Sequence, residues 1–218
     1  DDSNRESGEF LPVSRLSYAE TGANGGGWNA YVDASGASQV PGYTALASSP
    51  SGGLFRGNPA LGRETSWNFE GGGGLDRGPW SFDAAAFLRR DEDLTDWTFD
   101  TGGGPARTAN PIDLWVYGIE LLAGYGWGDG FASLGYAWLE KDEDYGATDV
   151  DASFYALNYP EHRVTVAVEW DPLPWLGFRT DTEWRRQREN LLRESGDTAW
   201  LTDAAVRLRT DRLPGAAL

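Results

Sequence analysis

Few side chains in this sequence could perform catalytic or metal chemistry. There is no cysteine, which excludes a disulfide framework, a thiolate metal site and a thiol nucleophile. His162 is the only histidine, so a histidine-rich metal site cannot form, and we expect a polar residue at the start of a strand. A serine hydrolase would need His162 as its base, and the sequence lacks a G-x-S-x-G elbow. We therefore predict a protein that is not an enzyme and has no cofactor.

Acidic residues are abundant, but their spacing favours charged surfaces over catalytic or metal sites. Asp181 and Glu183 lie two residues apart on one face of a predicted strand, where they would hydrate an interior and not form a glycosidase pair. Segment 140–151 could offer carboxylates to calcium, but it lacks the EF-hand spacing with a glutamate at position twelve. We expect a solvated loop end, whose only candidate calcium ligands are Asp142, Asp144, Asp149 and Asp151.

The charge and hydropathy of the chain exclude further classes of protein. Its formal net charge is −16, which would repel a phosphate backbone, so nucleic acid is not an expected partner. No run of about 18 apolar residues exists, which excludes a transmembrane helix but not a barrel, whose strands are apolar only at alternate positions. The mean hydropathy of −0.50 is compatible with such strands.

Alternation of apolar and polar residues, bounded by turn residues, predicts an all-β protein with nine strands. The clearest example is 80–90, where Trp80, Phe82 and Leu88 share an apolar face that is opposite Asp83 and Arg89. The nine predicted strands are 10–20, 28–37, 64–75, 80–90, 119–127, 131–140, 164–170, 176–184 and 201–209.

The predicted connections alternate between short and long along the chain. Tight turns rich in glycine, proline or aspartate are expected at 22–27, 76–79, 128–130 and 171–175. Long polar and aromatic loops are expected at 38–63, 91–113, 141–161 and 185–198. In an antiparallel meander this places all tight turns at one end and all long loops at the other, as in bacterial outer-membrane barrels.

Tryptophans border the predicted tight turns, at the level where a membrane interface would lie. Such rings favour that interface because they are apolar with one polar group. Aromatic residues at strand ends would also suit core packing in a soluble β-sandwich, but the alternation of loop lengths favours the membrane. The predicted girdle consists of Trp28, Trp80, Trp127, Trp170 and Trp175.

Four segments of the sequence share a pattern with a known family. The stretch from Asn58 to Ser66 has the form N-P-x-L-x-x-E-x-S. It resembles the element that closes an extracellular loop and opens a strand in TonB-dependent outer-membrane receptors of the siderophore and vitamin B12 type. Segments 87–97, 108–121 and 157–164 also resemble the family, and the order of all four carries the similarity.

The resemblance implies an up-and-down transmembrane β-barrel that is incomplete in this chain. Nine strands would be under half of a barrel of about 22 strands. Residues 1–218 would then be a C-terminal portion, without the plug domain, the energy-coupling box and the final strand. Expected partners are outer-membrane lipid, the protein's own plug domain, the TonB complex through the missing N-terminus, and a small-molecule chelate.

Aromatic and arginine residues of the long loops are the expected ligand contacts, because planar rings and guanidinium groups supply much of the affinity at recognition surfaces. The same residues could instead only pack the loops together. These candidates are Tyr43, Phe55, Arg56, Trp97, Arg107, Tyr155 and Tyr159.

We therefore expect an active transport receptor of the bacterial outer membrane that imports a scarce nutrient, such as a ferric siderophore or cobalamin, with energy delivered through TonB. One alternative is a passive porin or adhesin-type barrel. Another is a soluble β-sandwich binding module. The loop composition does not encode which ligand is transported.

Overall fold

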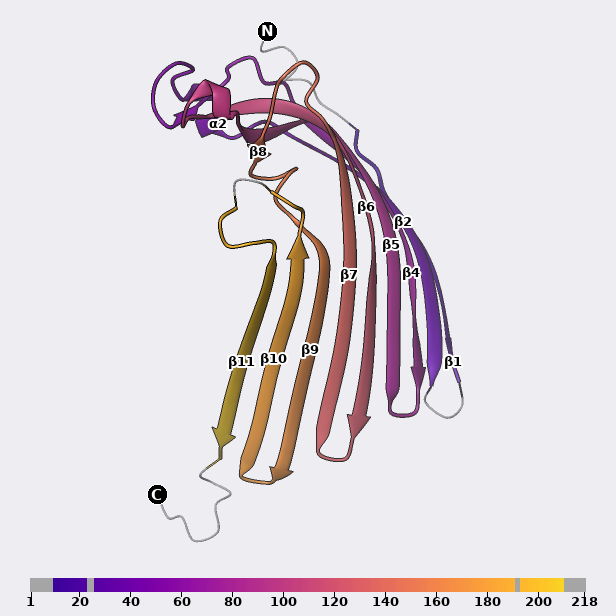
Figure 1. The fold of residues 1–218 in the computed structure, drawn as a ribbon. Helices are drawn as coiled ribbons and strands as arrows, with labels where there is room; N and C mark the ends of the chain where they lie inside the picture. The colour runs from indigo at the N-terminus through magenta and orange to yellow at the C-terminus, as the bar shows by residue number, and fades with distance from the viewer. Residues whose placement is uncertain (1–9, 23–25, 191–192, 210–218) are drawn as a thin grey trace.

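The computed structural model describes residues 10–22, 26–190 and 193–209, and their nine long strands form one antiparallel meander (Figure 1). All nine strands predicted from the sequence are confirmed. They are β1 (Val13–Thr21), β2 (Gly27–Gln39), β4 (Glu64–Arg77), β5 (Trp80–Phe99), β6 (Arg107–Trp127), β7 (Gly130–Asp144), β9 (Pro160–Leu173), β10 (Leu176–Gln187) and β11 (Thr198–Leu208).

The strand register places the predicted apolar residues on one face of the sheet, which we call the outward face. Directly paired residues of antiparallel strands share a face. One such row runs from Ala84 through Leu121 and Tyr136 to Val164 and Trp184. No second layer of described residues covers this face, and Leu121 is 46% exposed. The single curved sheet therefore contradicts a soluble β-sandwich and confirms the two opposed faces predicted from the sequence.

The opposite, inward face is polar, with aromatic side chains lying over glycines of neighbouring strands. The Tyr31 hydroxyl donates to Glu70 at 2.6 Å, and its ring covers Gly72, where a Cβ atom would come within 2.8 Å of it. Phe87 covers Gly118 on β6 in the same way, with 2.8 Å to an added Cβ. These glycines are required because any side chain would occupy the space of the aromatic ring.

The two ends of the sheet differ as the sequence predicts. Tight turns join β4 to β5, β6 to β7 and β9 to β10 at the lower end in Figure 1. The fourth predicted turn, 22–27, lies partly outside the described residues. The long connections gather at the upper end.

The predicted loops 91–113 and 141–161 are shorter than expected, because three strands continue past the predicted limits. β5 runs to Phe99 and pairs with β6 from Arg107 after an irregularity at Asp91–Leu94, where Asp93 has a φ of 54°. β7 runs to Asp144. The sequence lacks clear alternation in these polar segments, but pairing with a neighbouring strand satisfies their backbone groups.

Four short elements in the connections were not predicted. They are the helix α2 (Tyr43–Ala47), the two-residue strands β3 (Phe55–Arg56) and β8 (Ala152–Ser153), and the 3-10 helix η1 (Thr101–Gly103). β3 pairs in parallel with the start of β6, and β8 pairs with the end of β5. These pairings fix two of the long loops against the extended β5–β6 hairpin.

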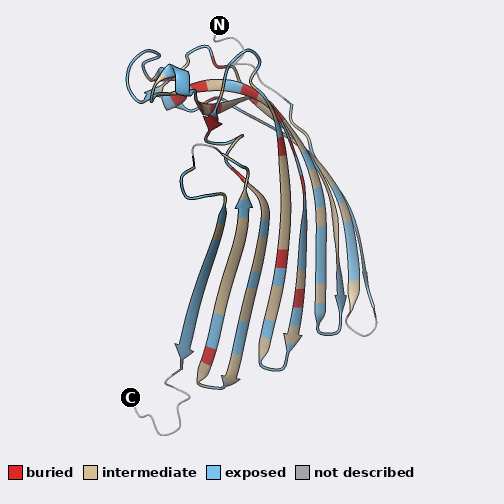
Figure 2. Cartoon of the chain, in the orientation of Figure 1, coloured by how far each residue is buried: buried red, intermediate tan, exposed pale blue. Residues whose placement is uncertain are grey.

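The buried hydrophobic residues lie at the loop end and not in the wall. Figure 2 shows buried segments mainly at that end, and the buried positions within the wall include Gly124, Gly135 and Gly177. Ile112, Leu114, Val116 and Ala156 form one cluster, and a second consists of Ala45, Leu61 and Ala109. Within the described ranges, no helix is long and apolar enough to cross a membrane.

Candidate functional site

An open hollow of about 840 Å³ lies on the inward face, where the loop ends of β2, β4 and β5 meet the long loops. Four of the seven predicted ligand contacts line it, namely Tyr43, Phe55, Trp97 and Tyr155. Its polar lining includes Gln39, Glu64, Ser66, Arg89, Asp91 and Thr95. We call this feature the loop hollow.

The aromatic lining of the loop hollow comes from two connections and from the extended part of β5. Tyr43 begins α2 and is 84% exposed. Phe55 lies on β3 and meets Trp97 of the extended β5 edge to face, with ring centroids 5.3 Å apart. Tyr155 follows β8. The hollow therefore depends on the short strands that the sequence did not predict.

The N-P-x-L-x-x-E-x-S element forms part of the floor and holds it together. Glu64 accepts hydrogen bonds from Gln39 Nε2 at 2.5 Å and from the Thr95 backbone N–H at 3.3 Å. Ser66 donates to the carboxylate of Asp91. Leu61, only 1% exposed, belongs to the cluster beneath α2. Glu64 and Ser66 thus join β4 to β5 on both sides of the irregularity at Asp91–Leu94.

Arg89 is the one cation that lines the loop hollow, among the residues the structure describes. Its Nε donates to Asp91 at 2.9 Å, and its Nη2 donates to the Tyr155 hydroxyl. The guanidinium therefore neutralises the buried Asp91 and orients the Tyr155 ring at the same time. Arg89 was not among the predicted site residues, although the alternation of 80–90 places it on the polar face of that strand.

Asp96 anchors the loop that carries Tyr155. This carboxylate is 1% exposed and accepts from the Tyr155 N–H at 3.0 Å, the Ala156 N–H at 2.9 Å and the Tyr145 hydroxyl at 3.1 Å. Burial raises the pKa of the Tyr145 phenol, and the Asp96 charge adds to that rise. Tyr145 therefore keeps its proton and remains a donor to Asp96.

Lys141 fastens the same loop from the other side. It lies three residues beyond Trp138, the last outward tryptophan of β7, and its Nζ donates to the Tyr155 carbonyl at 2.9 Å. The ammonium is 3.6 Å from the centroid of the Tyr155 ring, within cation–π range. Burial lowers the pKa of Lys141 to about 8, and the charge of Arg89 adds to the fall.

The structure places the other three predicted ligand contacts outside the lining of the loop hollow. Tyr159 is 3% exposed and accepts from the Lys141 N–H at 3.1 Å, so it has a packing role. Arg107 lies over the ring of Phe154, 4.6 Å from its centroid. The Nε of Arg56 is buried without a hydrogen-bond partner in the described structure. Tyr159 also contacts Arg188, which forms two 2.8 Å hydrogen bonds to Glu143.

The four calcium candidates do not come together. Asp144 accepts from the Gly146 N–H at 2.8 Å, and Asp151 accepts from the N–H and the hydroxyl of Thr101. The Thr101 hydrogen bonds lower the pKa of Asp151. No group of three or more His, Asp or Glu side chains suited to a metal ion occurs in the described part of the chain. Asp142 and Asp149 are exposed.

The predicted tryptophan girdle lies at the turn end of the sheet. Trp28, Trp80 and Trp170 are on the outward face and are 45–47% exposed. Trp127 is also outward and stacks near Tyr125, with ring centroids 6.0 Å apart. Trp175 lies in the turn between β9 and β10 and is partly buried. His162, expected at the start of a strand, is the third residue of β9.

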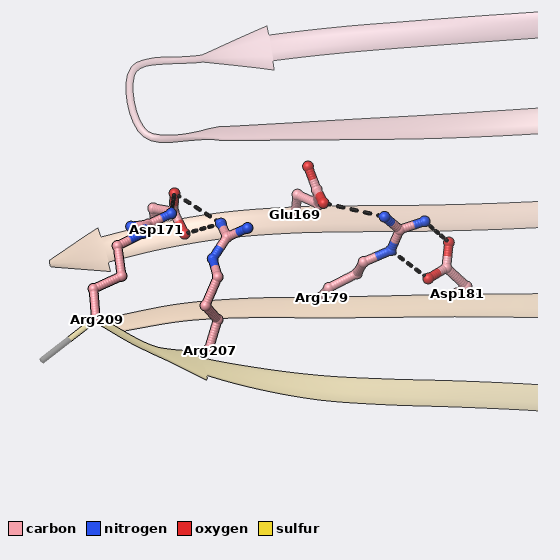
Figure 3. A network of polar contacts seen from close by, with 6 residues as sticks. All are labelled: Glu169, Asp171, Arg179, Asp181, Arg207 and Arg209. Atoms are coloured by element: carbon pink, nitrogen blue, oxygen red, sulfur yellow. Dashed lines mark hydrogen bonds and ion pairs between the residues drawn. The ribbon is translucent and has the colours of Figure 1, made fainter. Parts of the chain in front are cut away.

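A network of charges crosses the inward face of β9, β10 and β11 (Figure 3). Arg179 donates to Asp181 at 2.7 and 3.1 Å and to Glu169 at 3.3 Å. Arg207 and Arg209 converge on Asp171 at 3.0 Å each. The bridge from β11 to β9 passes over Gly177, whose added Cβ would be 2.2 Å from Asp171. Asp181 therefore pairs with arginine, as a hydrated interior requires.

Comparison with known proteins gives one family and several solved structures. The sequence profile described as "TonB dependent receptor-like, beta-barrel" matches residues 1–217. A comparison with curated protein sequences gives no match.

The similar structures share the arrangement of strands at low sequence identity. The copper transporter OprC is 16% identical, with a TM-score of 0.62 over 90% of this chain and 30% of its own. The siderophore receptor PirA from Pseudomonas aeruginosa is 16% identical, with a TM-score of 0.57 over 89% and 32%. The FrpB iron transporter from Neisseria meningitidis is 16% identical, with a TM-score of 0.60 over 84% and 30%. The chain thus spans under a third of each of these structures.

Proposed function

Because the chain belongs to the TonB-dependent receptor-like β-barrel family, we propose that it forms a C-terminal part of a receptor that imports a scarce metal chelate, with a ferric siderophore as the leading substrate. Proteins of this family lie in the bacterial outer membrane, so the outward face contacts lipid. The eleven residues from Trp80 to Arg90 cover about 25 Å once strand tilt is included, which matches the apolar band of such barrels.

The loop hollow is the observation that carries this proposal. Four aromatic rings, from two connections and the extended part of β5, surround a space of about 840 Å³ at the end of the sheet that bears the long loops. A hollow of this size suits a small-molecule ligand, and rings supply contact area at little entropic cost. The structural neighbours named as a siderophore receptor and an iron transporter support the choice of substrate class.

The rest of the transport machinery is part of the same proposal. Residues 1–218 would supply wall, lumen lining and loops, while a plug domain encoded elsewhere in the full protein would fill the interior. The charged inward face supports a hydrated lumen with such an occupant, because lipid would not tolerate Arg179 or Asp181. Energy would reach the plug through TonB.

Binding of labelled ligands to the full-length receptor tests the proposal. A ferric siderophore panel and cobalamin should be compared on wild type, on Trp97→Ala and on Trp115→Ala, a control on the outward face of β6. We expect binding of one chelate that weakens by about tenfold or more in Trp97→Ala and is unchanged in Trp115→Ala.

Two results would contradict the proposal. If the two tryptophan substitutions weakened binding equally, the loop hollow would not be the ligand-binding site. Uptake that continues in cells without TonB would indicate passive diffusion, the alternative expected from the same strand pattern.

A further inference from the structure

The outward face changes character sharply at the loop end of β9 and β10. Between the two ends of the sheet, the described outward positions of β2, β4 to β7 and β9 to β11 hold no Asp, Glu, Lys, Arg or His side chain. On β9 the first such residue beyond this band is His162, and on β10 it is Arg186.

His162 and Arg186 are direct partners in the register, so they lie side by side on the outward face. Cβ atoms of such pairs are about 5 Å apart. Trp138 flanks the pair on the β7 side, and Thr198 flanks it on the β11 side. The row below them holds Trp184 and Trp200, whose ring centroids are 6.4 Å apart. The two basic residues therefore sit at the upper limit of an aromatic belt.

The side chain of Arg186 is exposed and forms no ion pair or hydrogen bond with any residue in the described ranges. Arg90 lies on the same face at the same end, yet it is neutralised, with Asp113 2.7 Å from its Nη2 and the Trp115 ring 5.2 Å from its guanidinium carbon. His162 Nδ1 is 2.9 Å from the Tyr136 hydroxyl and the two rings stack, which leaves Nε2 available. The surroundings thus orient the imidazole and leave the guanidinium without a partner among the described residues.

We propose that Arg186 and His162 bind the phosphate headgroup of an outer-membrane lipid. The guanidinium fork matches phosphate oxygens in a bidentate manner, and Nε2–H would donate to a third oxygen when Tyr136 donates to Nδ1. The Thr198 hydroxyl is placed to add a donor, and acyl chains would lie along Val164, Trp184 and Trp200. This site rests only on the outer-membrane location and does not depend on the transported ligand.

The nearest outward acid on β7 is Glu140, two residues beyond Trp138. It forms no ion pair with His162 or Arg186 within the described structure, but its charge opposes an anion in the site. Replacement by glutamine is therefore expected to strengthen lipid binding.

Native mass spectrometry of the full-length receptor in detergent tests the site. Phosphatidylglycerol, a diacylglycerol with the same acyl chains, and inorganic phosphate would be titrated separately. We expect wild type to retain phosphatidylglycerol in preference to both, and Arg186→Gln to weaken that binding by about tenfold. Arg186→Lys should restore part of the binding, and the control Arg90→Gln should leave it unchanged. Heat-modifiable migration on gels verifies that each variant forms a barrel.

Several outcomes would overturn the proposal. An unchanged affinity in a folded Arg186→Gln variant would do so, as would an equal loss in Arg90→Gln or equal retention of diacylglycerol. Inorganic phosphate that binds as tightly as phosphatidylglycerol would replace the lipid site with a free-anion site.

Discussion

Asp96 offers a quantitative test of how the loop hollow is assembled. The substitution Asp96→Asn keeps the shape of the side chain but replaces one acceptor oxygen with a donor. In the native arrangement one oxygen accepts from the Tyr155 N–H, and the other accepts from the Ala156 N–H and the Tyr145 hydroxyl. The amide group must therefore face at least one buried N–H or O–H with another donor.

The expected cost follows from these contacts. At least one hydrogen bond to a charged acceptor is lost, and at least one buried donor is left without a partner. Together these changes destabilise the closed loop by about 2–4 kcal/mol. Each 1.4 kcal/mol is a factor of ten, so the open population should rise by roughly 30-fold to 1000-fold. The wall of the barrel should be unaffected, since Asp96 lies beyond the irregularity at Asp91–Leu94.

Hydrogen exchange of the Tyr155 and Ala156 amides in the full-length receptor measures this population directly. Asp100→Asn is a matched control, because Asp100 directly follows β5 and, like Asp96, accepts from a backbone N–H, that of Gly102 at 2.8 Å, but is exposed. We expect faster exchange in Asp96→Asn only. If both variants exchange like wild type, Asp96 does not hold the loop, and the assignment of Tyr155 to the hollow loses its support.

Two further predictions concern packing and pH. Gly118→Ala should lower folding yield, because its Cβ would lie 2.4 Å from the Trp138 carbonyl oxygen and 2.8 Å from Phe87, at a cost of about 1–3 kcal/mol. Heat-modifiable migration on gels measures this yield. The control Gly126→Ala, on the same strand with 3.9 Å of space, should leave the yield unchanged. Lys141 has a pKa of about 8 in the closed loop and the ordinary value of 10.5 when the loop is open. Between these two values the open loop binds more protons than the closed loop, so a rise in pH through this range should stabilise the closed loop. Limited proteolysis of the 145–159 loop should slow accordingly, and Lys141→Met should abolish the dependence; a wild-type loop that opens instead would contradict this sign.

The wall of the protein could be predicted from local pattern. Side chains of a strand alternate with a period of two, and a shift of one residue would move every apolar side chain to the wrong face. Trp80, Leu121, Val164 and their neighbours therefore determine the strands, the two faces and the register. The tight turns follow from glycine, proline and aspartate, whose backbone preferences are equally local.

The loop end could not be predicted in the same way. Its contacts join residues far apart in the chain, such as Asp96 with Ala156 and Arg188 with Glu143. Tyr43 and Arg107 were both predicted as ligand contacts of the long loops, yet of the two only Tyr43 lines the loop hollow, while Arg107 lies over Phe154.

By itself, the sequence determined a β-sheet with one apolar and one polar face, tight turns at one end and long loops at the other, because these depend on neighbours in the chain. Only the tertiary structure decided how far β5 and β6 extend, which aromatic residues meet, and that Glu64 and Asp96 hold them in place. Those choices depend on hydrogen-bond partners and buried space supplied by distant segments, and no local periodicity encodes them.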